Sequence, residues 1–454
     1  MNQLEQIVKS FSDFVWGLPL VILLIGGGLY LLILSRFLPF RYLGHAIQVL
    51  RGKYDDPNDP GQISHFKALT TALSSTIGMG NIAGVAVAIS IGGPGAMFWM
   101  WISAIVGMST KFFTSTLSIM YRGKDSNGEL QGGPMYFIMK GLGKNWKPLA
   151  VMFSFFGMIG ALPVVNVNQL TQAINDIVLR PNGIEVGLFS NSIIAIVLVV
   201  LTSVIVFGGL KRISNAASKM VPTMVLLYFV LVMIILISNY EIVPKYFYMI
   251  FTDAFSAENF KGEPFFGGVL GALILLGIRR GAFSNEAGIG TAPMAHGAAK
   301  TNEPVREGLV AMLGPLIDTL VVCTLTALAI LVTGVWETTS NNGVSLTASA
   351  FNNAMPTVGS YLLMICVLIF SVSSLFSYSY YGTKCMSFLI GADKKHYYNY
   401  VYIISIVLAV LTPFSMMLNL IDGVFALMAI PTMVATIILA PKVVKEIKAY
   451  KERM

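Results

Sequence analysis

Apolar stretches of about 20 residues recur along nearly the whole chain, and this pattern restricts the possible folds more than any other feature. A helix of about 20 residues crosses the roughly 30 Å of hydrocarbon in a bilayer. Of the 454 residues, 55% are hydrophobic and only 11% are charged, whereas a soluble domain carries about a quarter charged residues. The sequence therefore predicts an all-α polytopic membrane protein.

We expect eleven transmembrane helices in a single domain. The predicted spans cover residues 14–34, 68–91, 96–121, 149–177, 192–207, 220–237, 265–298, 309–335, 358–386, 397–411 and 414–439. Between the first two spans, Phe40, Leu43, Ile47 and Leu50 recur at helical spacing beside basic residues, which predicts a helix lying on the inner membrane surface.

The positions of the basic residues predict the orientation, because cytoplasmic loops carry the excess of Lys and Arg. Most of the 30 Lys and Arg residues fall in segments that face inward if the N-terminus lies outside, and only Lys9, Arg180, Lys245 and Lys261 fall in the outer ones. This places the tail at 442–454 in the cytoplasm. The net charge of +8 thus belongs to a plasma-membrane topology and gives no support for a nucleic-acid partner.

The sequence also argues against enzymes and pumps. Cys323, Cys366 and Cys385 lie inside apolar stretches and are odd in number, which argues against a disulfide framework. The four histidines are scattered singly, without the spacing of metal ligands. A GxxxxGK(S/T) phosphate loop is absent from the sequence, and a nucleophile with a matching base is not evident.

Two spans contain glycine and polar residues where a lipid-facing helix should have neither. They read TTALSSTIGMGNIAG from Thr70 and GIRRGAFSNEAGIG from Gly277. Such residues are costly in hydrocarbon unless they line a cavity or pack against protein. We expect helix breaks near 77–80 and 277–284, both close to the midplane. Close packing of small residues is the alternative explanation for Gly80, Gly84 and Ala88.

The two breaks run in opposite directions through the membrane and are separated by five spans, as in an inverted repeat of five plus five helices. The helix at 14–34 would then be an added leader, with repeats at 66–240 and 264–441. At such breaks, half-helix N-termini can bind a carboxylate, and unwound carbonyls can coordinate a cation such as sodium.

The runs TALSSTIGMGNIAGVA and RRGAFSNEAGIGTAP, together with LQGGPMYFI and IDTLVVCTLTAL, resemble the alanine or glycine:cation symporter family. The resemblance extends from about Phe66 to Pro441. It implies a LeuT-type fold, Na+ coupling, and alanine or glycine as substrate.

The resemblance also implies the site residues. Gly78, Met79, Gly80 and Asn81 match the GxGN segment of the first core helix. It places Thr76, Gly78, Met79 and Gly80 around the substrate carboxylate and makes Asn81 a candidate sodium ligand. In the sixth core helix, Ile278, Gly281 and Ser284 are chosen by depth.

For the sodium site shared across this fold, the run FSVSSL supplies Phe370, Ser373 and Ser374, which would face the carbonyls of Ser74 and Ile77. Oxygen ligands suit a hard cation. Serines in membrane helices also commonly bond back to the preceding turn, and that alternative stays open.

Polar residues elsewhere in the spans leave further choices open. Asn168 and Gln172 share one helix face and Asn166 and Gln169 another, so one pair meets substrate while the other bonds between helices; we favour Asn168 and Gln172. The intramembrane charges are expected to pair with one another or to form a gate, and a proton-carrier role for Asp318 or Glu286 is the alternative. These charges are Lys111, Arg279, Arg280, Glu286 and Asp318.

The function expected from the resemblance is sodium-coupled symport of small neutral amino acids, alanine and glycine, with both alanine enantiomers as candidates. A proton-coupled transporter of the same fold is the nearest alternative, and a channel is a more distant one. Nothing in the sequence requires an oligomer.

Overall fold

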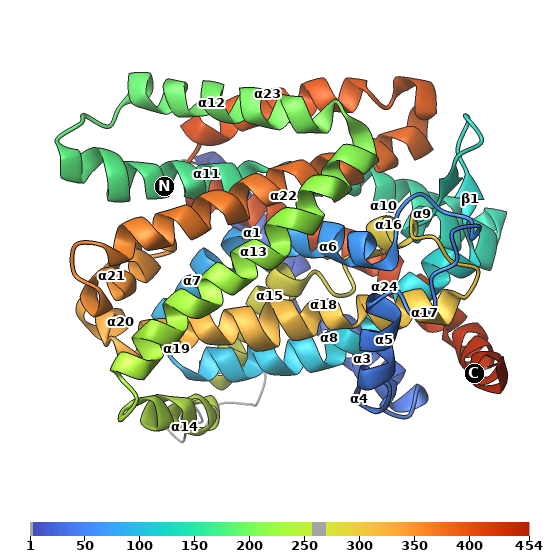
Figure 1. Cartoon of the computed structure of the whole chain (residues 1–454), viewed down its shortest axis with the longest axis horizontal. Coiled ribbons are helices and arrows are strands. Elements are labelled where there is room, and N and C mark those ends of the chain that lie inside the picture. The colour runs from blue at the N-terminus through green and yellow to red at the C-terminus, as the bar shows by residue number, and fades with distance from the viewer. Residues whose placement is uncertain (1–2, 257–268, 454) are drawn as a thin grey trace.

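A computed structural model describes residues 3–256 and 269–453, and its helices run mainly along one direction (Figure 1). In this part of the chain, seven helices are long and apolar enough to cross a membrane, or nine if each bent pair is one span. The seven are α8 (Gly95–Met120), the composite Lys144–Asn182, α12 (Leu188–Val206), α13 (Gly209–Ser238), the composite Pro304–Val332, α22 (Gly359–Ile390) and α24 (Phe414–Arg453).

The two bent pairs are the leader helix and the first interrupted span. They are Gln3–Val15 with Leu18–Leu34, bent by 49°, and His65–Thr76 with Gly80–Gly92, bent by 52°. Two shorter helices, α15 (Val269–Asn285) and α23 (Tyr397–Leu411), coincide with the remaining predicted spans. The structure is thus consistent with eleven spans; the start of the predicted span at 265–298, and Lys261, lie outside the described residues.

The first break lies where the sequence predicts it. Helix α6 (His65–Thr76) is capped by Ser64, whose side chain accepts a 3.4 Å hydrogen bond from the Lys67 N–H. The helix ends before Ile77, whose ψ of 89° lies outside the helical region. The chain resumes with a π-helical turn at Gly80–Gly84 and α7 (Val85–Gly92).

The second break lies farther along the chain than predicted. Helix α15 is continuous through residues 277–284, and the chain unwinds only after Asn285, before α16 (Ala292–His296). Glu286, Gly288 and Gly290 have φ values of 53°, 87° and 105°, which a helix does not accept. Gly277 and Gly281 instead let α15 approach α8: a Cβ on Gly277 would lie 2.7 Å from the Ala96 carbonyl oxygen.

Several elements lie between the spans. The predicted surface helix is present as α4 (Leu38–Arg41) and α5 (Leu43–Leu50). Helices α14 (Val243–Ala254) and α21 (Val344–Ala354) were not predicted, and α21 lies in the segment between the predicted spans at 309–335 and 358–386. A hairpin pairs β1 (Gly123–Lys124) with β2 (Leu130–Gln131).

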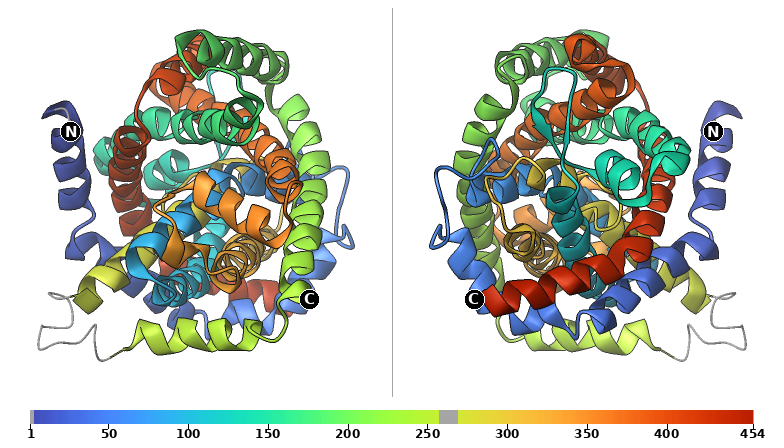
Figure 2. Two further views of the ribbon diagram at one scale, coloured as in Figure 1. Left: turned by 90° about the vertical axis from the view of Figure 1, so that its left-hand side faces the viewer. Right: turned by 90° about the vertical axis from the view of Figure 1, so that its right-hand side faces the viewer.

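The helices form two packed groups. We call the first the bundle: it contains α6, α7, α8, α15, α16 and α17–α19 (within Pro304–Val332), with α8 in contact with α7 and with α15–α17. We call the second the scaffold: it contains α11 (Val164–Ala173), α12, α13, α22 and α23. The leader helix α1 (Gln3–Val15) packs on α24 at the periphery (Figure 2). The broken helix α6 lies against α13 and α22, so the two groups meet at the first break.

Candidate functional site

A small cavity of about 20 Å³ lies at the first break, between the bundle and the scaffold. Its walls come from the first break, from the end of α15 and from the helices facing them. They are formed by Ser75, Thr76, Gly78, Gly80, Gly160, Leu162, Val165, Asn166, Phe283, Tyr378, Ile421 and Phe425. Of the residues expected around a substrate, Thr76, Gly78 and Gly80 line this cavity.

Backbone donors at the break are held by two asparagines. The Gly78 N–H donates a 3.0 Å hydrogen bond to Asn81 Oδ1, and the Met79 N–H donates one of 3.2 Å to Asn166 Oδ1. Asn168, two residues along α11, faces away: its Nδ2 donates to the carbonyls of Ala409 and Thr412 in and after α23. Asn166 therefore lies at the cavity, whereas Asn168 joins two scaffold helices.

The opposite wall of the cavity is apolar and tight. The rings of Phe283 and Phe425 lie 5.7 Å apart between centroids. A Cβ on Gly160 would lie 2.8 Å from Met428 Sδ and 3.2 Å from the Phe425 ring. The side chains of this wall are therefore closely packed against one another.

A cluster of hydroxyls joins α22 to the first break. Ser74 Oγ donates a 2.7 Å hydrogen bond to the Ser373 carbonyl, and Ser377 Oγ donates one of 2.9 Å to Ser74 Oγ. Ser373 and Ser374 both donate to the Phe370 carbonyl, at 2.9 and 3.0 Å.

The predicted sodium ligands of α6 and α22 are thus close together. A Cβ on Gly78 would lie only 2.6 Å from Ser374 Oγ, so glycine allows this approach. Ile77 is buried beside them at the helix end. The cluster offers several oxygen atoms, the donors that a sodium ion requires.

Asn81 and Ser284 meet at a buried carboxylate. Asp318 accepts hydrogen bonds from Asn81 Nδ2 at 2.8 Å and from Ser284 and Thr319 hydroxyls, both at 2.7 Å. Lys111, also buried, interacts electrostatically with both Asp318 and Glu286. A second group of oxygen atoms therefore lies beside the first break.

The two intramembrane arginines pair with a different acid. Arg279 Nε lies 2.9 Å from Asp422 Oδ2, and Arg280 contacts the same oxygen. Arg279 also reaches Asp13 of the leader helix, 2.9 Å away. The charges pair, as the sequence suggests, but Arg279 and Arg280 do so with Asp422 rather than with Asp318 or Glu286.

Three other expected substrate residues lie away from the cavity. Ile278 packs near Val21 of the leader helix, and Gly281 packs against Ser103 of α8. Gln172 bonds to Gln169 at 2.8 Å and to Ser345 at 3.2 Å, and it lines a separate open cavity of about 710 Å³.

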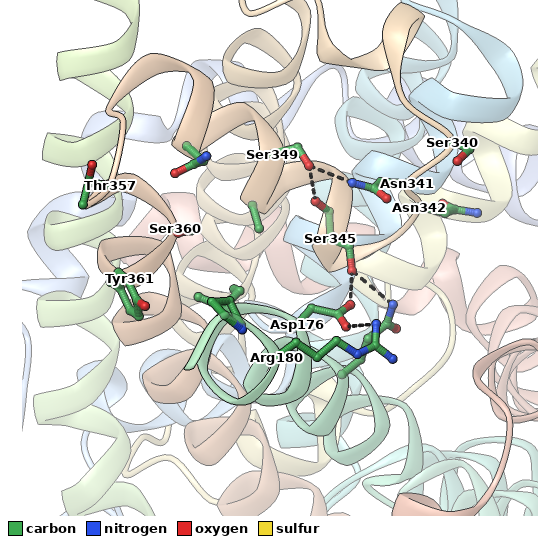
Figure 3. Close-up of a pocket in the computed structure, with 15 residues that line it drawn as sticks. Asp176, Arg180, Ser340, Asn341, Asn342, Ser345, Ser349, Thr357, Ser360 and Tyr361 are labelled. Carbon is green, nitrogen blue, oxygen red and sulfur yellow. Dashed lines mark hydrogen bonds and ion pairs between the residues drawn. The ribbon is translucent and has the colours of Figure 1, made fainter. Parts of the chain in front are cut away.

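That larger cavity lies between α11 and α21, with polar side chains pointing into it (Figure 3). Arg180 Nη1 lies 2.9 Å from Asp176 Oδ1, and Asp176 Oδ2 accepts a 2.7 Å hydrogen bond from Ser345. Asn341 in turn donates to Ser349 at 2.9 Å. The network links the scaffold to the helix α21 at this end of the molecule.

Sequence reasoning missed several wall residues of the small cavity: Ser75, Gly160, Phe283, Tyr378, Ile421 and Phe425. Tyr378 could have been found, because it lies four residues after Ser374 and so shares its face of α22. The residues of α24 give no such signal, since they are ordinary apolar side chains in an apolar helix.

Comparison with known proteins connects this geometry to a family. The model of the sodium:alanine symporter family matches residues 1–454. The sodium/alanine symporter AgcS of Methanococcus maripaludis is 39% identical over 98% of this chain and 97% of that protein. Two Bacillus subtilis proteins are also similar: the probable sodium/glutamine symporter GlnT (34% identical, 98% and 91% covered) and the putative sodium/proton-dependent alanine carrier YrbD (36%, 86% and 80%).

Among solved structures, MhsT in complex with L-phenylalanine superposes with a TM-score of 0.60, covering 84% of this chain and 89% of that one. At 15% identity this likeness bears on the fold alone. It confirms the LeuT-type architecture that the sequence predicts.

Proposed function

Because the chain belongs to the sodium:alanine symporter family, we propose that it carries alanine and glycine into the cell together with sodium ions. As a member of this family it is a multi-pass membrane protein that performs cation-coupled amino-acid transport, and it is not an enzyme. The finer assignment concerns the substrate, the ion and the residues that bind them.

The observation that carries the substrate proposal is the small cavity at the first break. Thr76, Gly78 and Gly80 supply polar and backbone groups on one side, where a half-helix end favours a carboxylate. Phe283 and Phe425 close the other side. The cavity must widen to admit even alanine, so competition between amino acids of different size has to rank the substrates.

We place the substrate carboxylate near Thr76, Gly78, Met79 and Gly80, with Asn166 as the scaffold contact in place of Asn168. Ser284 borders Gly80, since a Cβ on Gly80 would lie 3.6 Å from its Cα. Gln172, Ile278 and Gly281 are not part of this proposed site, because their contacts lie elsewhere.

We propose that one sodium ion binds to carbonyls of Ser74, Ile77 and Phe370 and to hydroxyls of Ser373 and Ser374. Asn81 would serve a second cation beside Asp318. Each sodium ion that enters with a zwitterionic substrate moves one positive charge inward, which yields about 2.3 kcal/mol at 100 mV. A tenfold sodium gradient adds about 1.4 kcal/mol. No further energy source is needed for uptake against a gradient.

The proposed orientation has the N-terminus outside and the C-terminus in the cytoplasm, with five-helix repeats at 66–240 and 264–441. It rests on the basic residues between spans. The end of the molecule with α20 (Val335–Thr338) and α21 then faces outward, and the end with the β-hairpin, α17 (Pro304–Ala311) and the C-terminus faces inward (Figure 1).

Proton coupling is the second candidate, favoured by the buried carboxylates of Asp318 and Glu286. Uptake of labelled alanine into liposomes that contain the purified protein distinguishes sodium coupling from proton coupling. An inward sodium gradient should drive accumulation, whereas a proton gradient with potassium in place of sodium should not. Competition by unlabelled glycine, D-alanine and glutamine then ranks the substrates. Uptake that persists without sodium and collapses with the pH gradient would overturn sodium coupling.

A further inference from the structure

Glu286 is the first residue of the unwound segment after α15. Its buried carboxylate accepts hydrogen bonds from the bundle and from the scaffold. Thr291, in the same segment, donates its hydroxyl to Oε2, and Tyr378 of α22 donates its hydroxyl to Oε1. Glu286 is 1% exposed and its φ of 53° is unusual for a residue with a side chain. The Tyr378 hydrogen bond therefore joins the bundle to the scaffold at a strained, enclosed position.

This contact lies directly beside the small cavity. The Tyr378 ring forms part of the cavity wall, as does Phe283, three residues before Glu286. From Glu286 the chain continues to α16, whose His296 Nδ1 lies 2.5 Å from Glu307 Oε1. The Tyr378–Glu286 bond thus lies between the cavity and the end of the molecule that carries α16 and α17, which is the cytoplasmic end in the proposed orientation.

Among the described residues, the hydrogen bonds between α22 and α6 join neutral groups, whereas Lys384 of α22 donates a 2.8 Å hydrogen bond to the Met294 carbonyl of α16. Ser74 Oγ meets the Ser373 carbonyl and Ser377 Oγ, and Ser75 Oγ lies 3.1 Å from the Tyr381 hydroxyl. A hydrogen bond to an ionised carboxylate is about twice as strong as one between neutral groups. Lys111 of α8 is buried on the bundle side and interacts electrostatically with Glu286.

We propose that the Tyr378–Glu286 hydrogen bond is the inner gate of the cavity, which breaks when the bundle and scaffold separate to release substrate inward. While it is intact, both carboxylate oxygens have donors and the cavity is closed on this side. When the groups separate, Tyr378 leaves with α22, and water entering the opened path replaces it at Glu286. The inference rests on the proposed transport function, since a gate requires a cargo.

The test uses Ser75→Cys as a reporter, because Ser75 lines the cavity next to the gate. Inside-out vesicles are treated with a membrane-impermeant maleimide, and the rate of labelling is measured. The native cysteines, Cys323, Cys366 and Cys385, are buried, and protein without the reporter gives their background. Adding Tyr378→Phe removes the hydroxyl but keeps the ring.

The matched control is Tyr402→Phe. Tyr402 is also buried, but its hydroxyl donates a 2.6 Å hydrogen bond to the Leu375 carbonyl, so both partners belong to the scaffold. We expect Tyr378→Phe to raise the labelling rate from the inner face about 10-fold, because the buried Glu286 carboxyl group then loses a hydrogen-bond donor, and Tyr402→Phe to leave the rate unchanged.

Equal labelling in the Tyr378→Phe and Tyr402→Phe proteins would overturn the gate. Glu286→Gln provides a second variant if Tyr378→Phe does not fold: it retains a weaker acceptor and should raise the rate by a smaller factor, and an unchanged rate would again overturn the gate. Labelling does not depend on which ion or amino acid is carried. A wild-type protein that fails to take up alanine would therefore count against the proposed function, and the labelling result would still decide the gate.

Discussion

The backbone N–H of Met79 donates a 3.2 Å hydrogen bond to Asn166 Oδ1, which ties the first broken helix to α11. Asn166→Ala should leave this buried donor unsatisfied and disorder the wall of the proposed substrate site. Such losses cost about 1 to 3 kcal/mol, so we expect alanine affinity to fall roughly 5- to 150-fold. Equilibrium binding of labelled alanine to purified protein measures this.

Asn168→Ala is the control for this prediction. Asn168 bonds to carbonyls of Ala409 and Thr412, so its loss should lower thermal stability while alanine affinity changes little. If Asn168→Ala loses alanine affinity and Asn166→Ala retains it, the substrate binds at the other face of α11, and the proposed site is wrong.

Substitution of Gly80 tests whether the substrate approaches the backbone at the first break. A Cβ on Gly80 would lie 3.4 Å from the Phe283 ring, an ordinary contact, so Gly80→Ala should fold while its methyl group takes up space in a cavity of about 20 Å³. Overfilling a tight site typically costs about 1 to 3 kcal/mol, so alanine affinity should fall by at least about fivefold.

Gly84→Ala provides the matched comparison, because a Cβ there meets no atom within 4 Å among the described residues. It should bind alanine as the wild type does, in the same assay. Unaltered affinity in Gly80→Ala would place the substrate away from the first break.

The sequence predicted the spans well because membrane insertion depends on local apolar length, which is visible in the chain. The first break was also predictable, since glycine and polar residues gather around Gly78 inside an otherwise apolar span. The sequence placed the second break too early in the chain, because glycine can serve either close helix packing or a break in a helix. Gly277 and Gly281 allow close packing on α8, whereas Gly288 and Gly290 adopt the positive φ values that end the helix.

The walls of the cavity were harder to predict because they depend on tertiary contacts. Asn166 and Asn168 are chemically identical, and only the direction of α11 relative to α6 and α23 separates their environments. Asp422 lies in a helix that appeared merely apolar, and its pairing with Arg279 and Arg280 joins segments about 140 residues apart.

Glu307 anchors the inner ends of both broken helices. One carboxylate oxygen contacts His65 Nδ1 at the start of α6, and the other lies 2.5 Å from His296 Nδ1 in α16. All three side chains are buried. Removing one member of such a buried set costs about 3 to 5 kcal/mol, so Glu307→Ala should markedly lower the midpoint of thermal unfolding in detergent.

Glu303→Ala is its control four residues away. Glu303 pairs with the exposed Arg453, and exposed ion pairs contribute little. The Glu303→Ala midpoint should stay close to that of the wild type. Equal midpoints in the two variants would show that the His65–Glu307–His296 cluster does not stabilise the fold.

Cysteine labelling tests the orientation. Asn341 and Asn127 are both exposed, at opposite ends of the helices, in the segment before α21 and in the β-hairpin turn. In intact cells, Asn341→Cys should react with an impermeant thiol reagent and Asn127→Cys should not, whereas inside-out vesicles should reverse the result. Labelling of Asn127→Cys from outside would invert the topology and the side on which the Tyr378–Glu286 contact opens.

Ser374 tests the sodium site through the linkage between ion and substrate. Its hydroxyl lies against Gly78 at the first break, where water cannot easily replace it. Ser374→Ala removes one oxygen ligand, and a loss of about 1 to 3 kcal/mol should weaken sodium affinity roughly 5- to 150-fold. Because linkage is reciprocal, alanine binding should weaken at low sodium and recover at saturating sodium. Thr76→Val, at the proposed substrate contact, should stay impaired at every sodium concentration.

Ser371→Ala is the control, since Ser371 lies on the same helix and its buried hydroxyl has no hydrogen-bond partner among the described residues. The dependence of alanine binding on sodium concentration in Ser371→Ala should match that of the wild type. If Ser374→Ala also matches the wild type, Ser373 and Ser374 serve only to bond back to the Phe370 carbonyl within α22, and the ion binds elsewhere.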